Sequence, residues 1–371
     1  MFCRNVNRWQ NDERPPIPAN LQDISIDPPY DQTLGGEPFV LYDSGPGDPN
    51  RIVIFSSDWA VELLSHCDMF FSDGTFKTVP NLFAQLFSVH GRYRDFVFPL
   101  VFCLTSNLTE QTYAVVYREL KRKARQLGVE LSPQQFMMDM ELADVNAART
   151  AFRQAHVQVC LYHFNQSLWR NVQRFGLAEE YETLDSPIRK QLVALMALPF
   201  IPLDEVVEVF ETITEDMDAH LDEFISYMES TYVLGPLRRR RRVPPRFPPE
   251  LWNVYQLTLD GFQRTNNAVE GWHNRLDKIC VVHHASLWRF LDAIRSEENQ
   301  IRNQVIQVQG GHTRIREPVN KKYKTNQRQI EEIVARYETY KQEGNILVYL
   351  RAIGYRLKTG PRAPPPPAED H

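Results

Sequence analysis

A change of hydrophobic periodicity near residue 165 constrains the fold more than any other feature of the chain. Before it, three apolar runs follow one another at hairpin spacing, namely MFFSDGTF, LFAQLFSVHG and FVFPLVFCLTS. A helical pattern at 107–128, an apolar run at 134–140, a second helical pattern and a last run at 156–164 come next. This order predicts an α/β domain with a mixed sheet, consistent with an RNase H-like core.

After that point the chain has only helical patterns up to about Gly235, which indicates a long all-α insertion. Helical patterns resume beyond a proline-rich stretch, so the C-terminal region is also expected to be helical. We therefore predict these segments: an extended Pro/Gly-rich arm at 1–50, the first part of the core at 51–164, the all-helical insertion at 165–237, a basic and proline-rich loop at 238–249, helices that complete the core at 250–357, and a disordered tail at 358–371.

Composition and cysteine usage limit the class of protein. The 371 residues are 43% hydrophobic and 24% charged, which predicts a sizeable buried core. The five scattered cysteines are typical of a reduced, intracellular protein. The polar N-terminal sequence predicts no signal peptide, and no apolar run is long enough to span a membrane. We expect a soluble intracellular protein.

Charge is distributed unevenly along the chain. The formal net charge is −5, yet residues 178–229 contain 14 acidic and only two basic side chains, so the rest of the chain is positive. An acidic block beside basic segments suits a protein with one phosphate-facing side. A solvated helical lobe next to a basic loop is the alternative interpretation.

Three carboxylates occupy positions at which metal-dependent chemistry is possible. Asp73 lies on or at the end of the first apolar run, Asp139 lies at the end of a later run, and Glu270 lies in the first turn of a downstream helix. In an RNase H-like sheet the strands of Asp73 and Asp139 are adjacent, and a helix alongside could deliver Glu270. Such oxygen ligands suit Mg²⁺ or Mn²⁺. Two ions would activate a water or a 3′-hydroxyl at a phosphodiester.

Each carboxylate also has a purely structural interpretation. Asp73 precedes a glycine, and an Asp-Gly pair after a strand is usually a turn. Asp139 and Glu141 precede a helical pattern and would serve as cap and macrodipole residues. Glu270 would close a capping box with Asn267 as the N-cap. Spacing alone does not choose between these interpretations and catalysis.

Four motifs together resemble the transposase domain of Mutator-like elements, the MULE family. They are FFSDGTFKTVPNLFAQLFSVHG, FMMDMELADVNAARTAF, VCLYHFNQSLWRNVQRFGL and RTNNAVEGWHNRL, in the family's order between about Ile52 and Leu357. The resemblance implies an RNase H-like core whose third acid follows a helical insertion. Carried over motif by motif, it assigns the metal-binding acids to Asp73, Asp139 and Glu270. Glu270 would then be both helix cap and third ligand.

The resemblance also implies a Cys-x-x-His pair, here Cys160 and His163. Two such ligands would form half of a tetrahedral zinc site, for which His273, Cys280, His283 and His284 are candidate partners without a clean second motif. The alternative is a buried cysteine beside a hydrogen-bonded histidine. Many relatives carry a zinc-binding DNA-recognition module ahead of the catalytic domain, whereas residues 1–50 contain Cys3 and no histidine.

Two further groups are candidate DNA contacts. The first is a run of five arginines, Arg238, Arg239, Arg240, Arg241 and Arg242. It would contact the phosphate backbone, act as a nuclear localisation signal or form a solvated linker. The second group is Trp272 and His273, which flank the third acid and would stack on a splayed base, with core packing of Trp272 as the alternative.

These observations predict a DDE-type DNA transposase catalytic domain that hydrolyses a phosphodiester and then transfers the strand, with Mg²⁺ or Mn²⁺ as its cofactor. Its partners would be transposon ends and target DNA, and it would act in the nucleus as a homo-oligomer without membrane contact. The alternative is a domesticated, non-catalytic DNA- or chromatin-binding protein that retains the fold.

Overall fold

The computed structural model describes residues 14–280, 286–312 and 321–357. The chain divides into two compact units. The first comprises Met1–Val157 and Asn266–Glu317, and the second comprises Gln158–Thr265 and Pro318–His371. The tail predicted at 358–371 lies outside the described residues, as do residues 1–13 of the predicted arm.

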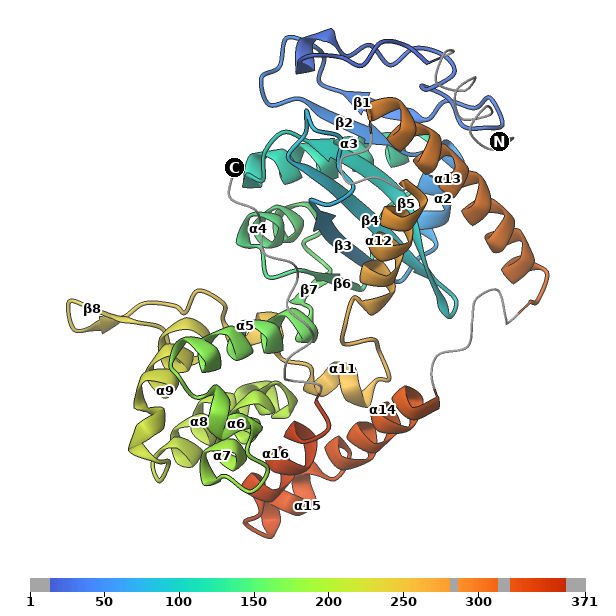
Figure 1. Ribbon diagram of the computed structural model, residues 1–371. Coiled ribbons are helices and arrows are strands. Elements are labelled where there is room, and N and C mark those ends of the chain that lie inside the picture. The colour runs from blue at the N-terminus through green and yellow to red at the C-terminus, as the bar shows by residue number, and fades with distance from the viewer. Residues whose placement is uncertain (1–13, 281–285, 313–320, 358–371) are drawn as a thin grey trace, which may run out of the picture. The chain divides into compact units, whose positions relative to one another are not determined.

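The first unit is built on a seven-stranded sheet with the order β1-β2-β5-β4-β3-β6-β7 (Figure 1). Its strands are β1 Val40–Asp43, β2 Ile52–Phe55, β3 Met69–Thr75, β4 Gln85–Tyr93, β5 Phe96–Thr105, β6 Gln135–Met138 and β7 His156–Val159. The pairs from β1 to β3 are antiparallel, whereas β3 and β6 are parallel. The predicted α/β class with a mixed sheet is therefore confirmed.

Five α-helices cover the two faces of this sheet. They are α2 Asp58–Ser65, α3 Glu110–Gln126, α4 Leu142–Ala151, α12 Asn267–Cys280 and α13 Leu287–Gln309, and the short 3-10 helix η1 Leu21–Asp23 precedes them. Ring contacts show that α3 and α12 cover opposite faces. Phe87 of β4 contacts Tyr113 and Tyr117 of α3, whereas His90 of the same strand contacts Trp272 of α12.

Alternation of side chains along β3 explains this layering. Phe70 packs against Phe136 of β6 and against Phe152, which caps the C-terminal end of α4, with ring centroids 5.8 and 5.9 Å apart. Successive side chains of a strand point to opposite faces of a sheet. Asp73, three residues after Phe70, therefore points to the face that α12 covers.

The predicted N-terminal arm is partly structured. Its residues Val40–Asp43 form β1, which pairs with β2, and the side chain of Arg51 donates hydrogen bonds to Asp43. The Pro/Gly-rich composition concealed this strand because β1 is short and only half-buried. The sheet therefore begins before residue 51, where the sequence placed the start of the core.

In its described residues, 158–265 and 321–357, the second unit contains no strand of the large sheet beyond the end of β7. Its α-helices are α5 Leu161–Arg174, α6 Ala178–Glu182, α7 Pro187–Met196, α8 Val206–Thr214, α9 Asp222–Met228, α10 Pro249–Trp252, α11 Tyr255–Leu259, α14 Lys321–Val334, α15 Tyr337–Gln342 and α16 Ile346–Gly354. The same unit contains a π-helical turn, Glu229–Val233, and a hairpin of β8 Leu237–Arg238 and β9 Arg241–Arg242. It also contains the short 3-10 helices η2 Leu198–Phe200, η3 Leu203–Glu205 and η4 Ala219–Leu221.

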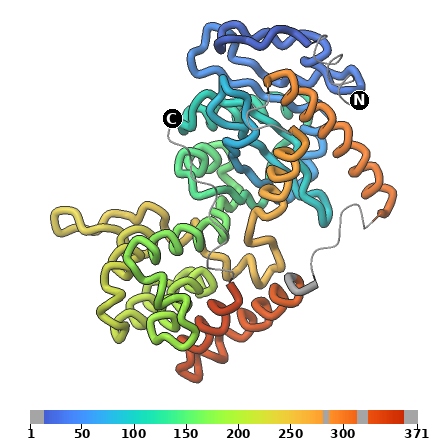
Figure 2. Tube along the Cα trace, viewed as in Figure 1, coloured from blue at the N-terminus to red at the C-terminus, as the bar shows by residue number. Residues whose placement is uncertain are grey.

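Residues 321–357 belong to the same unit as the helical insertion, and α16 packs against α7. Figure 2 shows the red C-terminal helices beside the green helices of the same unit. The backbone of α16 approaches α7 so closely that a Cβ on Gly354 would lie 2.2 Å from the carbonyl oxygen of Val193. Of the segment predicted to complete the core at 250–357, the first unit takes only the part from Asn266 to Glu317. Helical periodicity identifies which face of a helix is apolar, but it does not identify the element against which that face packs.

No helix in the described part of the chain is long and apolar enough to cross a membrane.

Candidate active site

Asp73 and Asp139 lie at the same end of two adjacent parallel strands. Phe71 of β3 pairs with Met137 of β6. Continuing this register by two residues places Asp73 level with Asp139, which directly follows β6. Neighbouring strands lie about 4.8 Å apart. The two predicted aspartates therefore lie side by side at this end of the parallel strand pair.

Asp73 belongs to a strand and not to a turn. It lies within β3 opposite Ser88 of β4, and it is buried, with 7% of its surface exposed. Its Oδ1 accepts a hydrogen bond of 2.9 Å from the backbone N–H of Gly74. A Cβ on Gly74 would lie 1.7 Å from the side-chain nitrogen of Gln85, so the glycine makes room for this neighbour. The turn interpretation of the Asp-Gly pair is wrong.

Glu270 lies in the first turn of α12, as the sequence predicted. The helix begins at Asn267, and the carbonyl of Asn266 accepts a hydrogen bond of 3.1 Å from the N–H of Glu270. The carbonyl of Asn266 thus accepts the first hydrogen bonds of the helix, which places the N-cap one residue before the predicted Asn267. Glu270 is half-buried on a helix that packs against β3 and β5.

His273 contacts Asp73 directly. Its Nδ1 lies 3.4 Å from Oδ2 of Asp73, and its Nε2 lies 3.3 Å from Oγ of Ser88. The same Oγ lies 2.9 Å from Nε2 of His90. Glu270 and His273 are three residues apart on α12 and thus neighbours on its surface, with Cβ atoms about 5–6 Å apart. Glu270 is therefore one helical turn from a residue in contact with Asp73.

Trp272 is part of the core of the first unit. It is 5% exposed, its ring lies 5.6 Å from the ring of Phe102, and its Nε1 donates a hydrogen bond of 3.1 Å to Glu297 of α13. A ring packed in this way offers no face on which a base could stack. The core-packing alternative is correct for Trp272, and the side chain of His273, 10% exposed, faces Asp73.

A fourth acid, Glu141, lies near Asp139 and Asp73. Both of its carboxylate oxygens lie 3.0 Å from the hydroxyl of Tyr113 on α3. Burial raises the pKa of Glu141, and the negative charges of Asp139 and Asp73 raise it further. Glu141 precedes α4 but makes no capping hydrogen bond with its side chain. Negative charge therefore accumulates at this end of the sheet, where a cation would relieve the repulsion.

Asp144 is buried one turn further along α4. It accepts hydrogen bonds from the hydroxyls of Tyr117 and Ser72, the latter at 2.7 Å. Burial raises the pKa of Asp144 from 3.8 to about 7, and the nearby charges of Glu141 and Asp73 act in the same direction. The carboxyl group thus holds a proton at pH values at which an exposed aspartate is ionised.

The raised pKa of Asp144 predicts a pH-dependent stability. Between about pH 4 and pH 7 the folded protein keeps a proton that the unfolded chain has released, so stability falls as the pH rises through this range. Asparagine cannot ionise and keeps an oxygen for the Tyr117 hydroxyl. We expect Asp144→Asn to remove this part of the fall, on the order of 1–4 kcal/mol at pH 7 relative to pH 4. Urea unfolding at a series of pH values measures the difference, and parallel profiles for both proteins would contradict it.

The acids do not form a ready-made metal site. Among the residues that the structure describes, no three His, Cys, Asp or Glu side chains are close enough together to hold one metal ion. The predicted zinc pair, Cys160 and His163, therefore has no third ligand close enough among the described residues. Cys160 is buried before the first turn of α5, and the ring of the half-buried His163 packs against Tyr162. The candidate partners His283 and His284 lie outside the described residues.

Residues 69–167 match the family profile of the MULE transposase domain. This segment is a MULE transposase domain. It contains β3, with Asp73, and the end of β6, with Asp139, and it ends before the helix that carries Glu270. A comparison with curated proteins gave no match. A MULE transposase domain implies a transposase-related function on DNA, and it makes the shared register of Asp73 and Asp139 a feature of that domain.

The five arginines outside the MULE domain form an exposed hairpin. Strands β8 and β9 pair Leu237 with Arg242 and Arg238 with Arg241. Arg239 and Arg240 make the turn with φ angles of 47° and 66°, the combination that a two-residue hairpin turn needs. Arg242 forms an ion pair with Glu229 and donates a hydrogen bond of 2.9 Å to the carbonyl of Gly235. The predicted loop is therefore a structured basic hairpin.

Several residues at the site were not predicted from the sequence. Ser88 and Tyr113 carry no motif, and their roles depend on strand register and on packing. Glu141 and Asp144 offered a weak signal, because together with Asp139 they form a cluster of acids at the start of α4. The sequence did contain a signal for the contact of His273 with Asp73, because His273 lies one helical turn after Glu270.

Proposed function

We propose that this chain is the catalytic part of a DDE-type DNA transposase, with Asp73, Asp139 and Glu270 as its acids. The observation that carries the proposal is the shared register of Asp73 and Asp139 inside the MULE domain. The sheet supports an RNase H-like core, because β5-β4-β3 form an antiparallel meander and β6 adds in parallel beside β3.

The three carboxylates supply oxygen ligands of the kind that a hard divalent cation takes. Asp73, Asp139 and Glu270 would hold Mg²⁺ or Mn²⁺. Burial is the main cause of the raised pKa of Glu141, and the further contributions of Asp139 and Asp73 support an anionic environment for the ion. When bound, such ions supply an activated water or 3′-hydroxyl and stabilise the leaving oxygen of a phosphodiester. The reaction would be hydrolysis at the element end followed by attack of the freed 3′-hydroxyl on target DNA.

The chain's own residues position the first acid. His273 and the backbone N–H of Gly74 contact the two oxygens of Asp73, one oxygen each. Ser88 lies between His273 and His90, so the imidazole of His273 is contacted on both sides. Both oxygens of Asp73 are thus oriented before any cation binds, which reduces the reorganisation that binding requires.

Nicking of supercoiled plasmid by the purified full chain tests this proposal. We expect single-strand cleavage with Mn²⁺ or Mg²⁺ and none after removal of divalent ions with EDTA, because the carboxylates alone cannot activate the attacking water. Cleavage that persists in EDTA would contradict the metal-dependent mechanism. DNA binding without cleavage under any metal condition would instead favour a domesticated DNA-binding protein.

The basic hairpin is proposed to contact the DNA backbone. Replacing Arg239 by Asn and Arg240 by Gly removes two charges while supplying residues that the turn prefers. We expect weaker DNA binding, with the slope of log K against log salt reduced by about two, and an unchanged or increased unfolding temperature. Fluorescence anisotropy with one DNA duplex at several salt concentrations measures the slope. An unchanged slope would show that the hairpin does not touch phosphate.

The cellular setting follows from the substrate. We propose that the chain acts in the nucleus, because the exposed arginines suit a nuclear localisation signal. Joining two element ends to one target further implies an oligomer, so we propose that the chain works as a homo-oligomer.

A further inference from the structure

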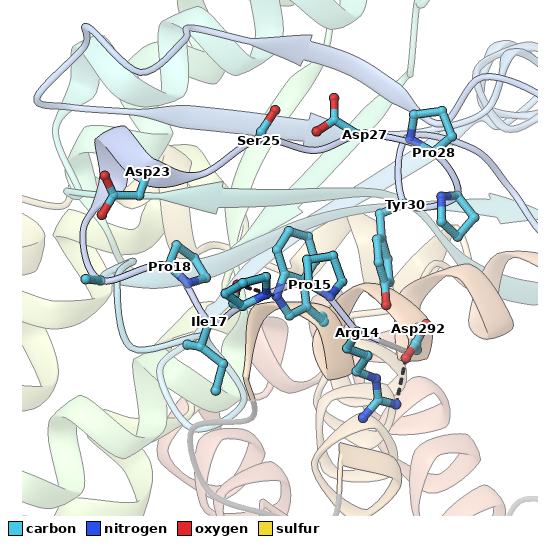
Figure 3. A pocket seen from close by; sticks show the side chains of 14 residues that line it. Arg14, Pro15, Ile17, Pro18, Asp23, Ser25, Asp27, Pro28, Tyr30 and Asp292 are labelled. Carbon is cyan, nitrogen blue, oxygen red and sulfur yellow. Dashed lines mark hydrogen bonds and ion pairs between the residues drawn. The ribbon is translucent and has the colours of Figure 1, made fainter. Parts of the chain in front are cut away.

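A cavity of about 910 Å³ lies between the N-terminal arm and the beginning of α13 (Figure 3). Its side chains next to α13 are engaged with one another. Arg14 forms an ion pair of 2.8 Å with Asp292, drawn as a dashed line, and the buried rings of Tyr30 and Trp288 lie 4.9 Å apart. These contacts fasten the arm to the first unit, and we assign no ligand to the cavity.

The basic hairpin of the second unit, by contrast, carries charges without a counter-ion in the described part of the chain. Arg238, Arg239, Arg240 and Arg241 are exposed, and none of them forms an ion pair within the described residues. Residues 236–249 contain six arginines and no acidic, amide or hydroxyl side chain. The hairpin therefore presents positive charge alone, which suits a polyanion such as DNA.

The turn of this hairpin is unfavourable for the residues that form it. Arg239 and Arg240 have φ angles of 47° and 66°. Turns of this type favour Asn-Gly, because residues with a longer side chain rarely adopt a positive φ. Arg238 and Arg241 pair directly across the strands, so their like charges share one face, with Cβ atoms about 4.5–5.5 Å apart. Local strain of this kind is concentrated at binding sites, and an anion at the tip would relieve the repulsion.

The base of the hairpin holds it in place on the second unit. Arg242 forms an ion pair with Glu229 and donates a hydrogen bond of 2.9 Å to the carbonyl of Gly235. A Cβ on Gly235 would lie 1.9 Å from the carbonyl oxygen of Val243, and the N–H of Val243 donates a hydrogen bond of 3.1 Å to the carbonyl of Pro236. Figure 1 shows the hairpin projecting away from the helices of this unit. A ligand therefore meets a tip that is already ordered.

The short length of the strands decides how this hairpin can meet DNA. Each strand has two residues, so the ribbon is too short to lie along a major groove about 12 Å wide and present a row of side chains to base edges. Only the turn can enter a groove. The minor groove is about 6 Å wide, and in A·T tracts it narrows and concentrates a negative potential that attracts inserted arginines.

We propose that the tip of the basic hairpin inserts Arg239 and Arg240 into the minor groove of A·T-rich duplex DNA. Arg238 and Arg241 contact the phosphates at the edge of the groove. The proposal rests on the DNA contact proposed above for this hairpin and adds a preference among DNA sequences to it. The preference arises from the shape and potential of the groove, without contacts that read individual bases.

Binding of the full chain to three fluorescein-labelled duplexes of equal length tests the proposal. EDTA is present, and the central tract contains A·T, G·C or inosine·cytosine pairs. Inosine lacks the amino group that guanine places in the minor groove but presents the same major-groove edge. We expect the A·T duplex to bind about tenfold more tightly than the G·C duplex, and the inosine duplex to bind nearly as tightly as the A·T duplex. Anisotropy titrations measure the three affinities.

Two variants with the same loss of charge separate insertion into the groove from contact with phosphate. Arg239→Asn/Arg240→Gly removes the tip arginines and supplies residues that the turn prefers, and we expect the three duplexes to bind almost equally. Arg238→Gln/Arg241→Gln removes two charges beside the turn. We expect it to weaken binding to all three duplexes alike and to retain the preference. Unfolding temperatures close to that of the unmodified chain establish that both variants fold.

Three outcomes would overturn the proposal. An inosine duplex that binds like the G·C duplex would place the hairpin in the major groove. A preference that survives in Arg239→Asn/Arg240→Gly would assign it to another part of the chain. Equal binding of all three duplexes by the unmodified chain would leave only the phosphate contact, which the salt dependence of binding measures separately. Absence of plasmid nicking would contradict the proposed catalysis and not the groove preference, because the preference is measured without metal.

Discussion

Replacing Asp73 with asparagine is expected to lower the rate of metal-dependent plasmid nicking by about a thousandfold or more. Asparagine keeps the shape of the side chain and its place in β3, but it removes the negative charge of one of the three proposed metal ligands, Asp73, Asp139 and Glu270. A metal ion that stabilises charge in the transition state contributes several kcal/mol, and each 1.4 kcal/mol corresponds to a tenfold change in rate. Initial rates with Mn²⁺ measure the effect.

Two controls separate this result from a loss of folding or of DNA binding. Asp95 lies in the exposed turn between β4 and β5, and Asp95→Asn is expected to nick at the unmodified rate. The Asp73→Asn protein should also bind DNA with the same salt dependence as the unmodified protein. Equal nicking rates for Asp73→Asn and the unmodified protein would show that Asp73 is not a ligand.

The largest effect on stability is expected in the second unit, at Trp252. This residue is fully buried, its ring stacks on that of Phe164 with centroids 5.1 Å apart, and Nε1 donates hydrogen bonds to the carbonyls of Phe247 and Tyr232 at 2.9 and 3.2 Å. Trp252→Ala leaves a cavity and two carbonyls without this donor. We expect a loss of about 3–5 kcal/mol.

Because the chain has two units, unfolding need not occur in one transition. Hydrogen exchange of the amides in α5 and α9 therefore measures the loss of stability within the second unit. Urea unfolding followed by circular dichroism measures the loss for the whole chain. Leu184→Ala, at a side chain that is 75% exposed, is the control and should change stability by less than about 0.5 kcal/mol. Exchange rates in α5 that match those of the control would contradict the packing argument.

Local sequence patterns were sufficient for the elements that carry the site. The three apolar runs became β3, β4 and β5, because alternation of side chains specifies which residues face the core. The helix predicted at 107–128 has Thr109 as its N-cap and ends before Gly128, which has a φ of 75°. The arginine run was recognised, but its turn was not, since Arg239 and Arg240 adopt a backbone conformation that arginine rarely takes.

The sequence by itself determined the order of the elements from β3 to β7, the position of Asp73 in a strand and of Asp139 at the end of one, and the helical position of Glu270. Only the tertiary structure decided that Ser88 lies opposite Asp73, that His273 contacts it and that Trp272 is buried. Tertiary packing also assigned residues 321–357 to the helical unit and β1 to the sheet. The physical reason is that periodicity encodes which face of an element is apolar, whereas strand register and the choice of packing partner depend on residues far apart in the chain.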